Sequence, residues 1–208
     1  MNITKASKRD LADVANVHIN CFRDSFSTQL GIRLLTKFYN TYFEKNPDLF
    51  CIAKDSSDVV VGFCMGYLSS DENLTNRFIK KNFFHFLGRC LLLAVTFNKR
   101  FWTKFFSFFR KTSKEIIVVD EELFKVDTSF TGDLLSICVL PEYRGKGVSS
   151  LLMSYYEKEL LKKNMKYCAL SVEPKNAIAI HFYKKHGYKE CKKSNNCLVY
   201  KKVLSEIE

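Results

Sequence analysis

The chain has 208 residues, of which 47% are hydrophobic and 26% charged, and its 33 lysines and arginines against 22 aspartates and glutamates give a net charge of +11. This length and apolar content are enough for one well-packed domain. Residues 1–10 are polar rather than an apolar secretory signal, and no run of about 18 uncharged apolar residues follows. We therefore expect a cytosolic chain without a signal peptide or a membrane-spanning helix.

The first seventy residues are predicted to fold in the order strand, helix, helix, strand, strand. Ser7 is the predicted cap of the first helix, and Asn46-Pro47 ends the second. Residues 25–29 are a polar break, and a turn at 55–58 joins the last two strands into a hairpin. The hydrophobic pattern places the five elements at residues 2–5, 11–22, 32–43, 49–53 and 59–68.

Residues 73–114 differ in composition from the rest of the chain. They contain no aspartate or glutamate, but ten lysines and arginines and eleven aromatic residues. This composition is typical of a basic amphipathic element at an interface. The apolar run at 83–97 is too short for a transmembrane helix and carries His85 and Arg89.

Several roles fit this basic segment. Its helices could pack on the domain, cover a ligand cleft or form a dimer contact, with the charge as solvated surface that attracts anions. Contact with a membrane surface or a lipid-linked substrate is a second interpretation, because each cation near an anionic leaflet adds about 1 kcal/mol. A nucleic-acid platform is disfavoured, because bases stack on exposed rings whereas these phenylalanines cluster as on buried faces.

The segment 133–163 is predicted to be an apolar strand, a basic turn and a helix. The strand covers 134–140, Pro141 breaks it, the turn covers 144–149, and the helix is periodic over 151–161. Such a turn directs unpaired backbone N–H groups and the positive end of a helix dipole to one place. Its glycines let the backbone approach closely. The pattern predicts an anion site, and a diphosphate fits it better than a lone carboxylate.

A further strand and helix follow. Residues 167–173 are predicted to be a strand, and Asn176 is the predicted cap of the next helix. Tyr183 lies seven residues on and so on the same helix face, and Gly187 ends the helix. The last predicted elements form a hairpin at 188–193 and 197–203.

These two stretches resemble the two signatures of the GNAT superfamily, the acyl-CoA-dependent N-acetyltransferases. The family's pyrophosphate loop reads Arg/Gln-x-x-Gly-x-Gly/Ala after a strand, and this chain reads Arg144-x-x-Gly147-x-Ser149, which departs by one hydroxyl. The family's second signature, Asn-x-x-Ala-x-x-x-Tyr-x-x-x-Gly-Phe/Tyr, is matched from Asn176 to Tyr188.

The resemblance implies an α/β (α+β) fold with a mixed, mostly antiparallel central sheet flanked by helices. It covers residues 1–70 and 131–204. We expect a single domain over 1–208, with a helical insertion at 71–130 embedded between the third and fourth main strands.

The resemblance also implies acetyl-CoA, or another acyl-CoA, as co-substrate. The turn would hold the pyrophosphate, the splayed central strand would hold the thioester and the pantetheine arm, and the Asn cap would bond the pantetheine. The cofactor-binding residues implied are Ile137, Cys138, Val139, Arg144, Gly145, Lys146, Gly147, Val148, Ser149, Asn176 and Tyr183.

Two residues are candidate catalytic groups. Tyr183 matches the family's general acid toward the coenzyme A thiolate, since a phenol with a pKa of about 10 can protonate a thiolate of similar basicity. Packing of its ring on the sheet is the alternative. Asp133 is a candidate general base, and because it precedes Ile137 by four residues we expect both on one face of the strand. Alternatively, Asp133 is only a hydrated carboxylate at the end of the strand. A chain of water molecules could then remove the proton without a dedicated base.

Acceptor residues follow only by analogy with the family. The loop between the first two helices helps to wall the acceptor pocket there, which gives Phe22, Ser25, Phe26 and Thr28 as weak candidates. Ribosomal-protein acetyltransferases carry a glutamate twelve residues before the tyrosine, where this chain has Ser171, and Glu173 is the nearby carboxylate. This departure disfavours protein acetylation.

The sequence therefore predicts an acyl-CoA-dependent N-acyltransferase, with acetyl the family's commonest group. It would pass that group directly, in a ternary complex, to a primary amine of a small molecule, such as an amino sugar on a nucleotide or lipid carrier. A protein or peptide N-acetyltransferase and a non-catalytic module that binds acyl-CoA or a membrane surface are the alternatives. A homodimer and a peripheral position at the inner membrane surface are compatible with both.

The eight cysteines fit a reducing compartment. They show neither a Cys-x-x-Cys pair nor the spacing of metal ligands. Small thiols inside apolar runs are typical of buried positions in intracellular proteins. We therefore expect free cysteines and no bound metal, with buried positions for Cys21, Cys64, Cys90, Cys138 and Cys168.

Overall fold

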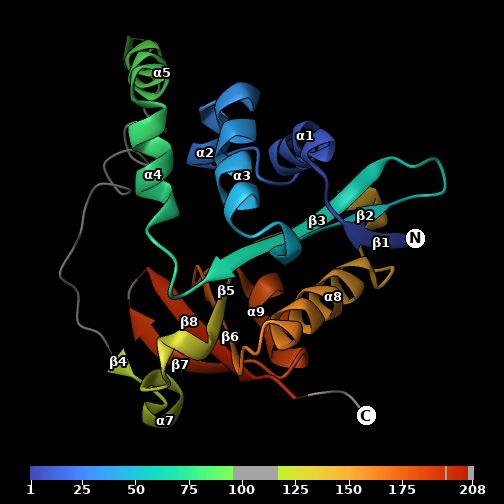
Figure 1. Cartoon of the computed structure of the whole chain (residues 1–208), viewed down its shortest axis with the longest axis vertical. Helices are drawn as coiled ribbons and strands as arrows, with labels where there is room; N and C mark the ends of the chain where they lie inside the picture. Colours follow the sequence, from blue (N-terminus) through green and yellow to red (C-terminus); the bar gives the residue numbers. More distant parts are fainter. Residues whose placement is uncertain (96–116, 195, 206–208) are drawn as a thin grey trace.

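The computed structural model describes residues 1–95, 117–194 and 196–205, and their strands form one eight-stranded sheet in the order β1-β2-β3-β5-β6-β8-β7-β4 (Figure 1). Among these pairs only β5 and β6 are parallel. The fold is therefore the expected mixed, mostly antiparallel sheet. The strands are β1 Asn2–Lys5, β2 Phe50–Lys54, β3 Val60–Leu68, β4 Ile117–Val118, β5 Thr131–Val139, β6 Tyr167–Val172, β7 Lys189–Ser194 and β8 Cys197–Val203.

Helices cover both faces of the sheet (Figure 1). The face under α1 and α3, called the α1/α3 face below, has a core that includes Tyr39, Phe50 and Phe63. The opposite α8/α9 face has a core that includes Leu152 and Tyr156. The helices are α1 Leu11–Cys21, α2 Phe26–Gln29, α3 Ile32–Lys45, α4 Leu74–Lys81, α5 Phe83–Val95, α7 Glu121–Phe124, α8 Val148–Lys162 and α9 Ala177–Lys185.

Two local predictions near the N-terminus were wrong. Ser7 caps a single 3-10 turn, Lys8–Asp10, with which it forms a capping box, and α1 begins only after that turn. The polar residues 25–29 are not a break but contain α2, because the Ser25 hydroxyl accepts a hydrogen bond from the backbone N–H of Thr28 and so caps a four-residue helix.

Strand β5 pairs with its two neighbours over different lengths. It pairs with β6 only from Thr131 to Leu134, opposite residues 167–170. It pairs with β3 along its whole length, up to Val139 opposite Gly62. Beyond Leu134 the strands β5 and β6 are therefore no longer hydrogen-bonded, and the sheet opens between them.

A β-bulge in β5 changes which residues share a face. Ser136 lies opposite Met65 but Leu134 lies opposite Gly66, so Leu135 is an extra residue in the ladder. Asp133 pairs with Tyr67, which packs on the α1/α3 face, whereas Ile137 packs on the α8/α9 face. The prediction that Asp133 and Ile137 share a face is therefore wrong, because it assumed unbroken alternation.

The segment between β3 and β5 begins with α4 and α5 and ends with β4 and α7. The buried side chains of Phe78, Phe86 and Cys90 pack with Leu30 and Leu34, so α4 and α5 are attached to the side of α2 and α3. Strand β4 extends the sheet at β7. Residues 96–114 of the basic segment lie outside the described residues, and the division into one domain with an insertion stays a prediction.

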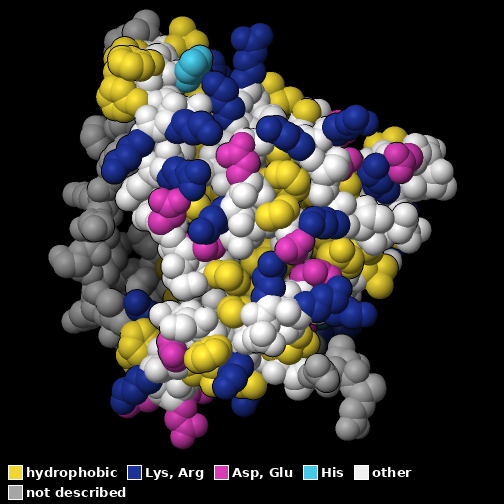
Figure 2. Space-filling view, in the orientation of Figure 1, with side chains coloured by type: hydrophobic (Ala, Val, Ile, Leu, Met, Phe, Trp, Pro, Cys, Tyr) yellow, Lys and Arg dark blue, Asp and Glu magenta, His cyan; other side chains and the backbone are white. Residues whose placement is uncertain are grey.

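The surface over α5 is distinctive in the view of Figure 2. Lysines and arginines are spread across the face shown, while hydrophobic side chains gather at the end of α5 beside a histidine. In the described part of the chain, no helix combines the length and apolar character needed to cross a membrane.

All eight cysteines are free. Cys64, Cys90, Cys138 and Cys168 are buried as predicted, whereas Cys21 is half-buried.

Candidate functional site

The two sequence signatures meet at one groove of about 600 Å³. It lies where β5 separates from β6, between the turn before α8 and the start of α9. Eleven of the predicted residues line it: Phe22, Ile137, Cys138, Val139, Arg144, Gly145, Gly147, Val148, Ser149, Asn176 and Tyr183.

The turn before α8 has the backbone geometry that an anion needs. Gly145 and Gly147 have φ angles of +73° and +78°, which favour glycine, and a Cβ built on either would meet nothing within 4 Å. The space in front of the turn is therefore open to a ligand. Because α8 begins at Val148, its first N–H groups and the positive end of its dipole border the same space.

The two cations of the turn are placed differently. The Nε of Arg144 donates a hydrogen bond to the carbonyl oxygen of Val139, at 3.0 Å, which fixes the guanidinium at the groove. The Nζ of Lys146 instead lies 5.3 Å from the centre of the Tyr143 ring, and Lys146 does not line the groove. Arg144 is therefore the better placed of the two for a phosphate.

Helix α9 supplies the other wall. The side chain of Asn176 accepts a hydrogen bond from the backbone N–H of Ala179, at 3.1 Å, which confirms the predicted cap. Tyr183 packs into the α8/α9 core and is only 9% exposed. Burial raises the pKa of its phenol well above the usual value, and the nearby Cys64 and Cys168 thiols add to this. The phenol is therefore protonated at neutral pH, as a general acid must be.

Cys21 lines the groove from the end of α1. Its thiol donates to the carbonyl oxygen of Val139, at 3.4 Å. A hydrogen bond with the Cys138 thiol and the guanidinium of Arg144 together lower the pKa of Cys21 to about 7, against the opposing effect of burial. We therefore expect Cys21 to be more ionised at neutral pH than an ordinary thiol.

Asp133 lies away from the groove, on the α1/α3 face. Its carboxylate accepts a hydrogen bond from the Ser69 hydroxyl and lies beside the Tyr67 side chain. Burial raises the pKa of Asp133, an effect that the Ser69 hydrogen bond and the charge of Lys201 reduce. Burial and the charge of Asp133 also raise the pKa of Tyr67, to about 12.

The remaining weak candidates are not brought into the groove. Ser25 and Thr28 are occupied in the cap of α2, where the Thr28 hydroxyl also donates to the carbonyl oxygen of Phe22. Phe26 packs against Phe86 of α5, with ring centres 6.4 Å apart. Ser171 is exposed and pairs with Val199 on β8, and Glu173 is exposed beyond the end of β6.

A buried polar network that the sequence did not indicate lies next to the groove. His18 on α1 is hydrogen-bonded through Nδ1 to the Tyr39 hydroxyl, at 2.6 Å, and through Nε2 to the Ser27 hydroxyl, at 3.0 Å. Burial lowers the pKa of His18 to about 4. The imidazole is therefore neutral at pH 7 and ties α1, α2 and α3 together.

Several groove residues were missed: Cys21, Tyr143, Ser150, Ile178, Ala179, Phe182 and Lys185. For Ala179, helical spacing could have predicted a position in the groove. Ala179 lies between Asn176 and Tyr183 at i+3 and i+7 spacing, so the same helix face could have been extended. Cys21 and Tyr143 directly precede the predicted residues Phe22 and Arg144, but only the tertiary fold shows that they also line the groove.

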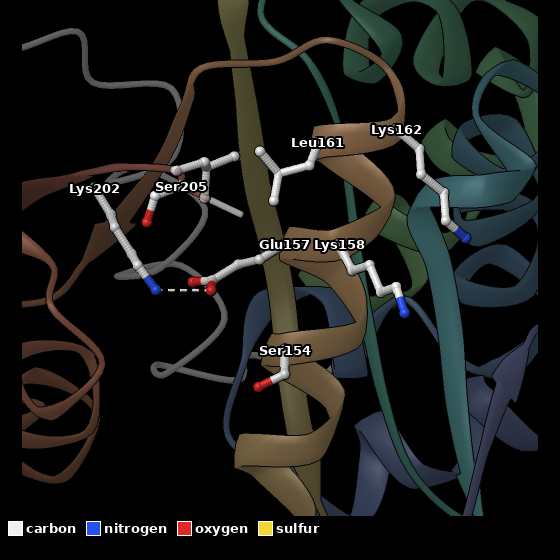
Figure 3. A pocket seen from close by; sticks show the side chains of 8 residues that line it. Ser154, Glu157, Lys158, Leu161, Lys162, Lys202 and Ser205 are labelled. Atoms are coloured by element: carbon white, nitrogen blue, oxygen red, sulfur yellow. Dashed lines mark hydrogen bonds and ion pairs between the residues drawn. The ribbon is translucent and has the colours of Figure 1, made fainter. Parts of the chain in front are cut away.

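A second hollow, of about 490 Å³, lies between α8 and the end of β8 (Figure 3). Glu157 and Lys202 face each other across it in an ion pair of 2.7 Å. None of the predicted site residues lines this second hollow.

In the described residues no three histidine, cysteine or acidic side chains come together as a metal site would require.

Comparison with known proteins gives a family match and similar structures. The model of the "Acetyltransferase (GNAT) family" matches residues 11–188. The chain is similar to PH1933 from Pyrococcus horikoshii OT3, with 18% identity, a TM-score of 0.61 and 99% of each chain covered. It is also similar to the ribosomal-protein-S18-alanine N-acetyltransferase from Escherichia coli, with 13% identity, a TM-score of 0.56, and 100% of this chain and 96% of the other covered. A third similar structure is the PaiA N-acetyltransferase from Thermoplasma acidophilum in complex with coenzyme A, with 17% identity, a TM-score of 0.56, and 97% and 98% covered.

Proposed function

The chain belongs to the acetyltransferase (GNAT) family and is a GNAT-type N-acetyltransferase, and from this premise we propose that it transfers an acetyl group from acetyl-CoA to the primary amine of a small molecule. The observation that carries the proposal is the groove itself. One opening in the sheet is bordered by a glycine turn fitted to phosphates, by the unpaired part of β5 and by a buried, protonated tyrosine.

We assign the donor's parts to this groove as follows. The turn from Arg144 to Ser149 holds the pyrophosphate through backbone N–H groups and the guanidinium. The unpaired edge of β5 at Ile137 and Val139 offers backbone groups to the pantetheine arm and the thioester, in place of the missing strand. Asn176 adds a side chain to the arm while it caps α9.

The transfer proceeds in a ternary complex without an acyl-enzyme. The neutral amine of the acceptor attacks the thioester carbon, a C–N bond forms, and the C–S bond breaks to release the coenzyme A thiolate. Tyr183 donates its phenolic proton to that sulfur, and the proton that the new amide nitrogen loses returns to the Tyr183 phenolate. Before the attack, the acceptor's ammonium group loses a proton to a general base. Asp133 is the candidate for an amine that enters from the α1/α3 face, because its carboxylate lies on that face and outside the groove.

The acceptor is proposed to be a small molecule with an anionic carrier, such as an amino sugar linked to a nucleotide or lipid. Its support is the acid-free basic segment 73–114, which attracts anions. Ser171 takes the place of a carboxylate expected in a protein-acetylating enzyme, which disfavours peptide acceptors. A cytosolic location, with or without homodimers, is part of the same proposal.

Thermal unfolding with ligands tests the donor site. Acetyl-CoA, longer acyl-CoAs and free CoA are added separately to the wild type and to Arg144→Ala. A ligand that binds the native state raises Tm by mass action, and loss of one charge-assisted contact is expected to weaken binding about tenfold. Lys158→Ala on α8, outside the groove, removes the same charge and should keep the full Tm increase.

The outcomes separate the candidate functions. A Tm increase that Arg144→Ala reduces supports the donor site, and the acyl chain with the largest increase identifies the donor. No increase with any acyl-CoA contradicts it. Turnover with free amines but not with peptides then supports the small-molecule acceptor. Turnover with peptides alone supports a protein acetyltransferase, and binding without any turnover supports a non-catalytic module.

A further inference from the structure

Helix α5 presents an unusually apolar surface to solvent. Phe84 is 83% exposed, and Leu91 and Leu92 are 58% and 56% exposed. Phe84, Leu87 and Leu91 follow one another at i+3 and i+7 spacing, so they form a single stripe on one side of the helix. This stripe is called the α5 face below. Scattered exposed leucines are ordinary, but a continuous stripe of this kind marks an interaction surface.

The α5 face is held in a fixed direction by the opposite side of the same helix. Phe86 and Cys90 are each 8% exposed and pack with Leu30 and Leu34. The Nε of Arg89 donates to the carbonyl oxygen of Gln29, at 3.1 Å. Because one side of α5 is packed on the body of the protein, the exposed stripe must point outward, and Figure 2 shows hydrophobic side chains gathered at the end of α5.

The charges next to the α5 face are mainly positive, although Lys81 forms an ion pair of 3.8 Å with Glu44 of α3. Lys80 and Lys81 are exposed at the end of α4, two to three residues before Phe83. The segment 73–114 contains ten lysines and arginines and no acidic residue. An apolar stripe with a cationic surround is complementary to one kind of partner, a surface that is apolar inside and anionic outside.

We infer that the α5 face and the lysines before it bind the surface of an anionic phospholipid bilayer, with α5 lying in the plane of the interface and its apolar side chains among the acyl chains. This inference goes beyond the proposed acyl transfer and does not depend on it. The lysines supply long-range attraction and the α5 face supplies insertion, so both should be needed. A second copy of the chain is the competing occupant, but its own cationic segment would repel this one.

Vesicle co-sedimentation tests the inference with the full chain. Vesicles of pure phosphatidylcholine are compared with vesicles that contain a quarter phosphatidylglycerol, at low and high salt. We expect binding to the anionic vesicles only, and a clear decrease in 0.5 M salt because screening shortens the reach of the charges.

Two pairs of variants separate insertion from charge. Phe84→Ser with Leu91→Ser alters only exposed side chains and should abolish sedimentation with vesicles, whereas Leu151→Ser on α8, 49% exposed, should not. Lys80→Gln with Lys81→Gln should weaken binding by roughly tenfold or more, since each cation near the surface adds about 1 kcal/mol. Lys158→Gln with Lys162→Gln removes the same charge from α8 and should have no effect.

Each result has a defined meaning. An unchanged Tm and an unchanged circular dichroism spectrum show that the variants are folded. Equal sedimentation with neutral and anionic vesicles, no sedimentation with either, or full binding by the Phe84/Leu91 variant would overturn the inference. A dimer in analytical ultracentrifugation that the same variant dissociates, without vesicle binding by the wild type, would assign the α5 face to a second copy instead.

Discussion

The two faces of the sheet next to the groove differ in the groups that form them, backbone on one and side chains on the other. The proposed donor side is built mainly from backbone: a glycine turn, the start of α8 and the unpaired edge of β5. The α1/α3 face, where we propose that the acceptor binds, is built from side chains of separate helices, with His18, Tyr39 and Ser27 joined in one buried network. The donor side is drawn from two short stretches of sequence, and the buried network from three successive helices, α1, α2 and α3.

This difference follows from what each side has to hold. A constant ligand with a diphosphate can be bound by N–H groups, which every residue has, so only glycines and helix starts are constrained. An acceptor must be distinguished from other amines, and side chains do this. Changes on the donor side should therefore affect turnover and coenzyme binding in separable ways, whereas changes on the α1/α3 face should also affect stability.

The largest effect is expected for Tyr183→Phe. Removal of the general acid should lower kcat by about 100-fold to 10,000-fold, because the thiolate then leaves without a proton. The ring stays in its packed position, so acetyl-CoA should still raise Tm by nearly the wild-type amount. Tyr155→Phe on α8, which does not line the groove, is the matched control and should keep full activity. A kcat within twofold of the wild type would remove Tyr183 from the mechanism.

His18 should make stability depend on pH. Its pKa is lowered to about 4 in the folded protein by burial, against about 6.5 when unfolded. Its stabilising contribution is therefore complete above pH 6.5 and is lost as the pH falls toward 4, by about 3 kcal/mol in total. Urea unfolding at pH 7, 5.5 and 4 should show this decrease in the wild type.

In His18→Asn the decrease in the free energy of unfolding over the same range should be smaller by about that amount. The variant also loses the bonds to Tyr39 and Ser27, so it should be less stable at pH 7. If the free energy of unfolding falls equally with pH in both proteins, His18 is not the titrating group.

Asp133→Asn should separate activity from stability. If the carboxylate takes the amine's proton, the neutral amide should lower kcat about tenfold or more. Burial raises the folded-state pKa of Asp133, so its contribution to stability is present below its ordinary pKa and is lost as the pH rises through the folded value. At pH 7 the ionised carboxylate is therefore unfavourable, and the variant should have a higher Tm. If kcat is unchanged while Tm rises, Asp133 is not the general base and its carboxylate has only a structural role.

The smallest expected effect concerns Cys21. With a pKa of about 7, its alkylation by iodoacetamide should rise about fivefold from pH 6 to 7 and level off above pH 8. Because Cys21 lines the groove, saturating acetyl-CoA should slow the reaction. Cys197, half-buried and outside the groove, is the control in the same molecule, and peptide mass spectrometry measures both. If acetyl-CoA slows the alkylation of both thiols equally, the protection comes from greater stability of the whole protein and not from a ligand next to Cys21.

The local geometry of the proposed donor side could be predicted from the sequence, because its constraints are local. Gly147 has the positive φ angle that its motif requires, and Asn176 caps its helix as the spacing indicated. Lys146 was placed in the site by the motif, but its side chain turns to Tyr143, since a motif fixes the backbone of a turn and not the direction of a long side chain.

The α1/α3 face was predicted poorly for physical reasons. A β-bulge has no reliable residue signature, so the extra residue Leu135 and the resulting face of Asp133 could not be read from alternation. The contact of His18 with Tyr39 joins residues 21 apart on two helices, and an isolated histidine on an apolar helix face gives no sign of its partner. The main helices and strands were predictable because their apolar periodicity is strong.

The early end of the β5–β6 pairing has a mechanical consequence. Only four residue pairs, from Thr131 with Tyr167 to Leu134 with Leu170, join the β1-β2-β3-β5 half of the sheet to the β6-β8-β7-β4 half. So short a ladder resists bending much less than the long ladder between β3 and β5. The opening is thus a line of weak backbone pairing, and we expect a ligand that bridges it to stiffen the sheet there. Amide hydrogen exchange on both sides of the opening should slow together when acyl-CoA binds.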